Sequence, residues 1–202
     1  QYLEAGADMI ETNTFSSNSI SQSEYGAAAM AREMALAGAR TARATVDQWN
    51  AEHPEKQAFV CGSIGPTSKS LSLATDLNDP AYRPYSFTDM SEAYKEQISA
   101  LIEGGVDAIL VETCFDALNT KAAIYALHCL EGENPDLGGF PVMISLSVND
   151  RSGRTLTGQT VEAFYTSIRH ANPVSFGLNC SLGADDLDPL VSEVAGWSDC
   201  AV

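Results

Sequence analysis

The sequence contains few positively charged residues. Its 202 residues include 11 Lys and Arg against 27 Asp and Glu, which gives a formal net charge of −16. Nucleic acids and anionic membranes repel a surface of that charge, so we expect neither as a partner. The sequence also lacks a signal peptide and any apolar run long enough to span a membrane, and we therefore expect a cytoplasmic location.

Paired cysteines are missing as well. Five cysteines, an odd number, occupy positions 61, 114, 129, 180 and 200, without the spacing of a disulfide framework. This usage indicates a reducing compartment, in agreement with the cytoplasm. No Gly-x-Gly-x-x-Gly motif follows a predicted strand, which weakens a dinucleotide-binding interpretation.

Five short apolar runs are predicted to form strands, each followed by a helical pattern. The strands are expected at residues 9–15, 58–64, 108–115, 142–148 and 175–180. Such runs are typical of parallel strands that are buried on both faces. Repeated strand–helix units favour an α/β fold with a parallel sheet, either as a TIM barrel or as an open doubly wound sheet.

The predicted helices carry start and stop signals. The first is expected at about 24–49, and the second runs from a cap at Thr88 to a stop at Gly104 and Gly105. The others are expected at about 119–130, from near Thr160 to before Pro173, and after Asp185. A helix end, a glycine stop and a strand start at 3–8 recur at 102–107, which supports an internal repeat.

Both ends of the sequence have the pattern of interrupted elements. Residues 1–6 read as the last turn of a helix that ends at a glycine, and residues 199–202 read as the start of a strand. We therefore expect the chain to be part of a longer protein. Its edges would then expose apolar surface, which favours association.

Two long polar loops follow predicted strands, at 65–87 and 150–158. Both would lie on the same rim, because the carboxyl ends of parallel strands meet at one edge of the sheet. Long loops in compact domains are often functional, and tolerated surface insertions are the alternative.

The run 173–183 predicts a strand that carries the thiol of Cys180 to its carboxyl end. A cysteine on that rim is a candidate metal ligand or nucleophile. Position alone favours a small buried side chain, since free cysteine is often buried. The other thiols do not complete a zinc site: Cys61 is expected in the core, Cys114 has an uncertain facing, and Cys129 lies within a helix.

Glu112 follows the apolar run 108–111, where a carboxylate requires a partner. That partner is either a ligand ammonium group or a cation of the protein, such as Lys69 or Arg154. Gly62 and Ser63 follow another strand, and their backbone N–H groups could bind a carboxylate, although such glycine-rich turns are common for structural reasons.

Five segments, in the same order along the chain, resemble the N-terminal homocysteine-binding domain of cobalamin-dependent methionine synthases. They are residues 11–17, 62–67, 112–113, 152–163 and 177–180. The most specific are Ser-Gly-Arg-Thr-Leu-Thr-Gly-Gln-Thr at 152–160 and Gly-Leu-Asn-Cys at 177–180. The second motif is similar to that of homocysteine methyltransferases generally, whereas the first points to the cobalamin-dependent branch.

The resemblance implies a (β/α)₈ TIM barrel with a zinc ion bound by three cysteines. Cys180 matches one of these ligands, and the other two, an adjacent Cys-Cys pair, would lie beyond residue 202. The first strand of the barrel would precede residue 1. Residues 1–202 are therefore expected to form an incomplete homocysteine-binding domain, a partial TIM barrel with parallel strands.

The implied reaction is methyl transfer from methylcobalamin to zinc-activated homocysteine, which gives methionine. Glu112 would pair with the ammonium group of homocysteine, and the backbone of Gly62 and Ser63 would hold its carboxylate. Asn13 and Asn179 are further candidate substrate-binding residues. Cobalamin and methyltetrahydrofolate would bind to other domains of the same protein.

Two alternatives remain open. One is a cobalamin-independent homocysteine methyltransferase that uses betaine or S-methylmethionine as methyl donor. The other is a barrel fragment without activity. The length of the parent protein distinguishes the first alternative from a cobalamin-dependent synthase, because its parent would lack the cobalamin- and folate-binding domains. The zinc content per chain distinguishes an inactive fragment from an intact enzyme.

Overall fold

The computed structural model describes residues 1–76 and 78–202, and its centre is a parallel sheet. The described part of the chain forms five strands, β1 (Met9–Glu11), β2 (Phe59–Ile64), β3 (Ala108–Cys114), β4 (Val142–Leu146) and β5 (Ser175–Leu178). They lie in the order β1-β2-β3-β4-β5, and each pair of neighbours is parallel. This order confirms the prediction of parallel strands and differs from that of a doubly wound sheet, in which the strand order reverses.

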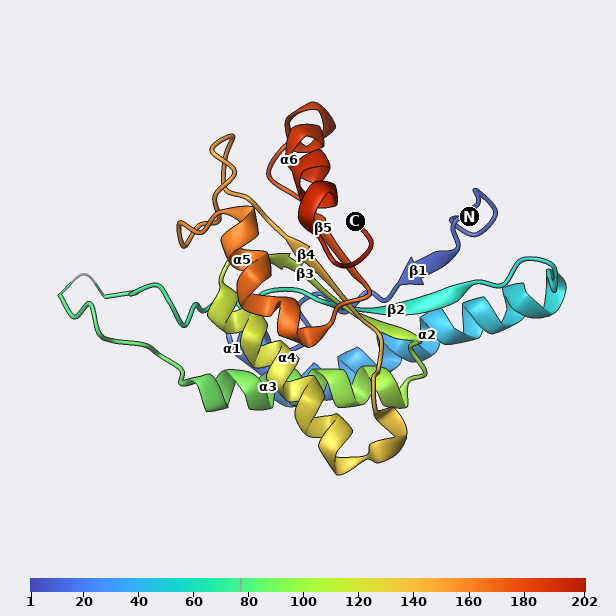
Figure 1. Cartoon of the computed structure of the whole chain (residues 1–202). Coiled ribbons are helices and arrows are strands. Elements are labelled where there is room, and N and C mark those ends of the chain that lie inside the picture. Colours follow the sequence, from blue (N-terminus) through green and yellow to red (C-terminus); the bar gives the residue numbers. More distant parts are fainter. Residues whose placement is uncertain (77) are drawn as a thin grey trace.

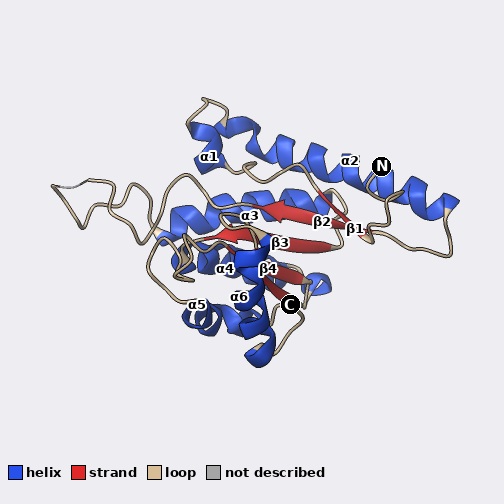
Figure 2. Cartoon of the chain, turned by 90° about the horizontal axis from the view of Figure 1, so that it is seen from above, coloured by secondary structure: helices blue, strands red, loops and turns tan. Residues whose placement is uncertain are grey.

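The helices form a layer in the same order as the strands. They are α1 (Ser19–Ser23), α2 (Ala31–Glu52), α3 (Phe87–Glu103), α4 (Ala117–Glu133), α5 (Val161–Ile168) and α6 (Ala184–Trp197). Three short 3-10 segments also occur in the described residues: Ala28–Met30 precedes α2, Pro135–Leu137 follows α4, and Arg169–Ala171 follows α5. From α2 to α6, each helix contacts the next, as Figures 1 and 2 show for α2 and α3. Right-handed strand–helix–strand connections produce this arrangement.

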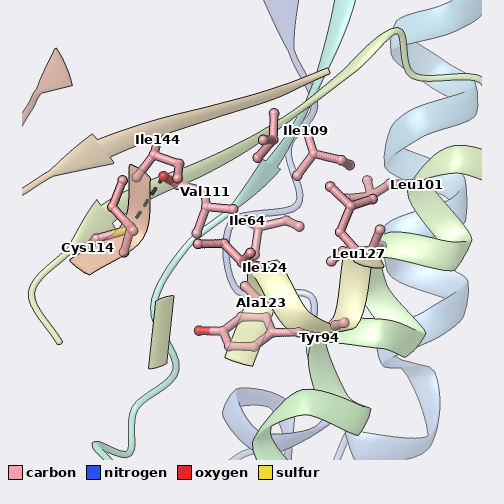
Figure 3. Close-up of a cluster of buried hydrophobic side chains, with 14 of the residues drawn as sticks. Ile64, Tyr94, Leu101, Ile109, Val111, Cys114, Ala123, Ile124, Leu127 and Ile144 are labelled. Carbon is pink, nitrogen blue, oxygen red and sulfur yellow. Dashed lines mark hydrogen bonds between the residues drawn. The ribbon is translucent and has the colours of Figure 1, made fainter. Parts of the chain in front are cut away.

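The two faces of the sheet carry different side chains. Along β3, Ile109 and Val111 are buried beneath the helices, whereas Leu110 and Glu112 are half-buried on the opposite face. The helix-facing side forms the main core, in which side chains of β2 and β3 pack against α3 and α4 (Figure 3). In the described residues the sheet is open and does not close into a barrel.

Gly62 lies on the helix-facing side of β2. A Cβ atom at this position would lie 3.1 Å from the Leu101 Cδ1 and 3.1 Å from the Ile109 Cδ1. The glycine therefore allows close packing of α3 on the sheet.

Three helix starts differ from the prediction, and the first two are those of α3 and α4. Ser86 caps α3 in place of Thr88: its side chain accepts a hydrogen bond from the Asp89 N–H, and the Asp89 carboxylate accepts one from the Ser86 N–H. This reciprocal capping box satisfies two N–H groups that would otherwise lack partners. Helix α4 begins at Ala117, after the cap Asp116, and not at residue 119.

The first predicted helix, at about 24–49, is also wrong in its start. The chain forms the short α1 first, and the long α2 begins only at Ala31. Gly26 separates them with a φ of +68°, a left-handed conformation that ends a helix and that glycine adopts without steric cost.

The two polar loops extend from the carboxyl ends of β2 and β4 on the same side of the molecule, as predicted (Figure 1). Residue 77, within the first loop, lies outside the described residues. Asp116 fixes this loop to α4, because its carboxylate accepts hydrogen bonds from the Ser70 Oγ, the Ser72 N–H and the Ser72 Oγ. No helix in the described part of the chain is both long and apolar enough to cross a membrane.

Candidate active site at the carboxyl edge of the sheet

The carboxyl ends of the strands bring predicted site residues to one edge. Ser63 and Glu112 lie at the ends of β2 and β3, and Asn179 and Cys180 directly follow β5. On the open face beside them lies a depression of about 230 Å³. Its lining residues are Glu11, Leu110, Glu112, Met143, Ile144, Ser145, Ser175, Gly177, Leu178 and Asn179.

Glu112 is held by hydroxyl groups. The Ser63 Oγ donates to the Glu112 Oε1 at 2.5 Å, and the Thr113 Oγ1 donates to the Oε2 at 3.4 Å. The side chain is half-buried and contributes to the lining of the depression. A carboxylate fixed in this way can accept a further charge-assisted hydrogen bond from a ligand.

Lys69 and Arg154, which were considered as partners of Glu112, bind other groups. The Lys69 Nζ lies 2.6 Å from the Glu24 Oε1, and the Arg154 Nη1 donates to the Gly158 carbonyl at 2.8 Å. Among the residues that the structure describes, Glu112 forms no ion pair. The structural alternative, a salt bridge within this chain, is therefore absent from the described residues.

Glu11 adds a second carboxylate to the lining of the same depression, at the end of β1. Partial burial, and then the charge of Glu112, raise the pKa of Glu11 above its ordinary value. Two carboxylates that face the same space favour a cation there. Glu11 was not predicted as a site residue, because its position in the motif at 11–17 does not reveal which face of the strand it occupies.

The side chain of Asn179 forms three hydrogen bonds with residues of other strands. Its Oδ1 accepts from the Ser145 Oγ at 2.8 Å and from the Thr113 N–H at 3.2 Å. Its Nδ2 donates to the Thr113 Oγ1 at 2.8 Å. Ser145 and Thr113 were missed as site residues, although a serine within the apolar strand β4 is a signal of polar contacts.

Ser63 connects the ends of β1 and β2. Its N–H donates to the Thr12 Oγ1 at 3.0 Å, and its carbonyl accepts from the Thr14 Oγ1 at 2.7 Å. Asn13 lies between these two buried threonines and is exposed. The roles of the Gly62–Ser63 backbone and of Asn13 in binding a substrate stay predictions. Ser63 contacts Glu112 through its side-chain hydroxyl and not through its backbone.

Cys180 is exposed, so the alternative of a buried thiol does not hold. Its φ is +67°, and that of Ser181 is +60°. Two consecutive left-handed residues end the strand in a sharp turn before α6. The Ser181 Oγ lies 3.0 Å from the Ser147 Oγ, which ties this turn to the segment that follows β4.

A model of the homocysteine S-methyltransferase family matches residues 1–202. The chain belongs to this family. Among solved structures, the metallated homocysteine methyltransferase MmuM from Escherichia coli has a TM-score of 0.75 and 19% identity, over 96% of this chain and 65% of that chain. The apo form has a TM-score of 0.68 and 18% identity, over 96% and 64%. The oxidised form has a TM-score of 0.56 and 16% identity, over 95% and 81%.

The chain spans less than two thirds of the length of the metallated and apo MmuM chains. At these identities the likeness concerns the fold alone. It agrees with a five-stranded parallel sheet as part of a TIM-barrel-like domain.

The thiols of this chain occupy different environments. Burial raises the pKa of Cys61 and that of Cys114 to about 12, so both are protonated core side chains near neutral pH. Cys129 and Cys200 are partly exposed. In the described ranges, 1–76 and 78–202, no cluster of three His, Cys, Asp or Glu side chains could hold a metal ion. Cys180 offers one exposed thiol at the edge, which is suited to serve as a single ligand of a zinc site.

Proposed function

We propose that this chain is the homocysteine-binding part of a cobalamin-dependent methionine synthase, which transfers the methyl group of methylcobalamin to homocysteine. Cobalamin and methyltetrahydrofolate bind to other domains of the same protein in this proposal. The observation that supports homocysteine binding is Glu112, a half-buried carboxylate at the edge of the open face that forms no ion pair within the described residues. The choice of cobalamin as donor rests instead on the resemblance of residues 152–160.

Homocysteine has three groups to bind, and the edge of the sheet offers a candidate for each. Its ammonium group pairs with Glu112, and Glu11 adds negative potential from the same depression. The proposal places its carboxylate at the Gly62–Ser63 segment, with Asn13 as a weaker candidate. Its thiol then lies toward Cys180, which is exposed at the end of β5.

The donor chemistry of this edge is compatible with zinc. Cys180 supplies a soft thiolate, and further ligands would have to come from outside the described residues. When bound, zinc lowers the pKa of a coordinated thiol, so that the thiolate is available as the nucleophile. The residues of this chain orient homocysteine for that role: Glu112 fixes the ammonium end, and Ser63 holds Glu112.

The overall transfer is balanced without a redox partner. A bond forms between the homocysteine sulfur and the methyl carbon, and the bond between that carbon and its donor breaks. The thiol proton leaves to solvent, and the donor keeps the electron pair of the broken bond.

Calorimetric titration of the full-length protein with homocysteine tests the role of Glu112. Glu112→Gln should weaken homocysteine binding about ten- to a hundredfold, because a charge-assisted hydrogen bond contributes about 1.5–3 kcal/mol, and zinc content should not change. Glu24→Gln is the matched control, since Glu24 pairs with Lys69 instead. Equal affinities for Glu112→Gln and the unmodified protein would contradict the proposal.

Cys180→Ala tests the metal end of the site. In the full-length protein it should abolish tight zinc binding and methyl transfer to homocysteine. Methyl exchange between folate and cobalamin should continue, because the proposal assigns it to other domains. Retained zinc and activity would contradict the assignment of Cys180.

A second candidate is a homocysteine methyltransferase that does not use cobalamin, since the family match concerns homocysteine methylation and specifies no methyl donor. The same binding edge would serve that reaction with a different donor. Assays of the full-length protein with methylcobalamin, betaine and S-methylmethionine distinguish the two.

A further inference from the structure

The alternation of side chains between the two faces of the sheet is interrupted near the carboxyl end of β3. The β3–β4 pairing shifts register between Val111 and Cys114. Regular alternation would place Cys114 on the same open face as Glu112, but the Cys114 side chain is 4% exposed and lies in the core (Figure 3). The irregularity thus leaves both Glu112 and Thr113 half-buried at the open edge.

In this arrangement Thr113 has an unfavourable backbone conformation. Its φ is +55°, in the left-handed region that β-branched residues rarely adopt. Such a conformation persists only where surrounding contacts hold it. The structure shows these contacts, because both the N–H and the Oγ1 of Thr113 are bound by the Asn179 side chain.

The hydrogen bonds form a chain in which Asn179 donates to Thr113 and Thr113 donates to Glu112. The Asn179 Nδ2 donates to the Thr113 Oγ1, so this hydroxyl is an acceptor there and can direct its own hydrogen elsewhere. It directs that hydrogen to the Glu112 Oε2, at 3.4 Å. Ser145 fixes the other end of the amide by donating to its Oδ1.

Asn179 also connects strands that are not neighbours. It follows β5 and reaches Thr113 on β3, while β4 lies between these strands and supplies Ser145. The next residue in the chain is Cys180. One side chain therefore ties the turn that carries the exposed thiol to the segment that carries the carboxylate.

We propose that Asn179 is a positioning residue, which holds Glu112 through Thr113 and fixes the distance from Glu112 to Cys180. This inference rests on the proposed function, in which Glu112 binds the ammonium end of homocysteine and Cys180 lies at the thiol end. A direct contact of Asn179 with the substrate stays a separate prediction, and the test below distinguishes the two roles. The fixed distance sets the length of amino acid that the site accepts, so Asn179 determines the preference for homocysteine over cysteine, which is one methylene shorter.

The test compares variants of the full-length protein by homocysteine titration and zinc analysis. Asn179→Ala should weaken homocysteine binding about tenfold, since a displaced binding group loses affinity, while zinc content is retained. The preference for homocysteine over cysteine should fall by a similar factor, because one methylene accounts for about 10- to 200-fold discrimination in a rigid site. A purely structural role would lower the amount of folded protein and leave this ratio unchanged.

The decisive measurement is a double-mutant cycle of Asn179→Ala and Thr113→Val. If Asn179 acts through the Thr113 hydroxyl, the double variant should lose less homocysteine affinity than the two single losses combined, because both substitutions break the same link to Glu112. Fully additive losses are expected for a direct substrate contact of Asn179, and that result would overturn the inference. Ser145→Ala is the matched control and should have a smaller effect, because the contacts to Thr113 remain.

Two further outcomes separate this inference from the proposed function. Homocysteine binding by the unmodified protein, with unchanged affinity and selectivity in Asn179→Ala, would overturn the inference alone. Failure of the unmodified protein to bind homocysteine would overturn the proposed function and the inference with it. If Asn179→Ala does not fold, Thr113→Val tests the same link from the other residue. This variant removes the Thr113 hydroxyl that joins Asn179 to Glu112, so it should weaken homocysteine binding. An unchanged affinity would contradict the inference.

Discussion

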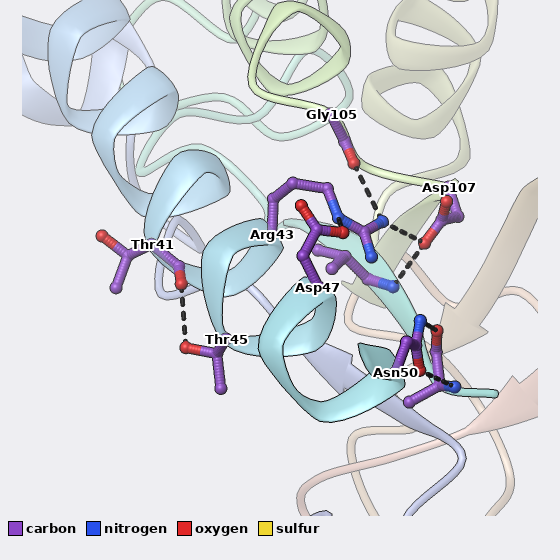
Figure 4. A network of polar contacts seen from close by, with 9 residues as sticks. Thr41, Arg43, Thr45, Asp47, Asn50, Gly105 and Asp107 are labelled. Carbon is purple, nitrogen blue, oxygen red and sulfur yellow. Dashed lines mark hydrogen bonds and ion pairs between the residues drawn. The ribbon is translucent and has the colours of Figure 1, made fainter. Parts of the chain in front are cut away.

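Arg43 on α2 pairs with Asp107 at the start of β3, with 2.9 Å between the Arg43 Nη1 and the Asp107 Oδ2 (Figure 4). The same carboxylate oxygen accepts from the Val60 N–H at 2.7 Å. Asp107 thus joins α2, β2 and β3 at the amino edge of the sheet. Glu112, near the opposite end of β3, is bound by hydroxyls instead. One strand therefore carries a structural carboxylate at its start and a candidate binding carboxylate near its end.

We expect Asp107→Asn to lower the free energy of unfolding by about 1–2 kcal/mol. The substitution removes the charge that pairs with Arg43 and weakens the hydrogen bond from the Val60 N–H. Asp47→Asn is the matched control. Asp47 also pairs with Arg43, but its side chain is 66% exposed, so its removal should change stability by less than about 0.5 kcal/mol. Urea denaturation measures both values. Equal losses would contradict a special role for Asp107.

A close contact between α2 and α3 gives a second prediction. A Cβ atom on Gly104 would lie 2.3 Å from the Ala39 Cβ, so Gly104→Ala forces the helices apart and should destabilise the fold by about 1–3 kcal/mol. Gly132→Ala is the control, since Gly132 lies in α4 with no atom within 4 Å of its Cβ position. It should stabilise the protein by about 0.5–1 kcal/mol, because alanine loses less conformational freedom in a helix. Thermal unfolding measures both, and stabilisation by both variants would contradict the close contact.

The strands could be predicted because their apolar runs are continuous, and the repeat at 3–8 and 102–107 because both segments contain a glycine stop. Gly6 and Gly105 have φ values of +109° and +89°, so the repeat is also structural. Helix starts were less predictable: Thr88 and Ser86 are both favourable caps, and only the spacing from Ser86 to Asp89 produces a capping box.

The contacts within the candidate site could not be predicted in the same way. The bonds of Asn179 to Thr113 join residues 66 positions apart. They depend on a register shift in β3 that local propensity does not reveal. The same shift decides the facing of Cys114, which the sequence left open. Side-chain types at the strand ends therefore indicated the site, whereas its internal geometry required the packed sheet.

The thiols should differ in reactivity toward an alkylating reagent at pH 8. Cys180 is exposed and should react first. Cys61 and Cys114 should react only after unfolding, because burial raises the pKa of each to about 12 and leaves almost no thiolate at that pH. Mass spectrometry of peptides from the labelled protein gives the order of modification. Cys180→Ser should remove the fast site, and complete labelling in denaturant is the control. Early modification of Cys61 or Cys114 would contradict their place in the core.

Glu11 makes stability depend on pH. Burial and the charge of Glu112 raise the pKa of Glu11 in the folded protein above the ordinary value of 4.5 that it takes when unfolded. As pH rises through this window, the unfolded chain releases its proton while the folded chain retains it, so the unfolded state is favoured. The stability associated with protonated Glu11 is thus present below the unfolded pKa and is lost as pH rises through the folded pKa.

Glu11→Gln removes this effect, since glutamine is neutral at every pH. Compared with the unmodified protein, the variant should therefore gain free energy of unfolding between pH 4 and pH 7, because only the unmodified protein must hold a second, partly desolvated charge beside Glu112 at the higher pH. Urea denaturation at both pH values measures the difference, and Glu96→Gln, at an exposed position on α3, is the control. A gain of the same size at pH 4 and pH 7 would mean that the substitution acts through packing and not through charge. A relative loss at pH 7 would mean that ionised Glu11 is stabilised by a partner, and would contradict a depression in which two carboxylates repel each other and attract a cationic ligand.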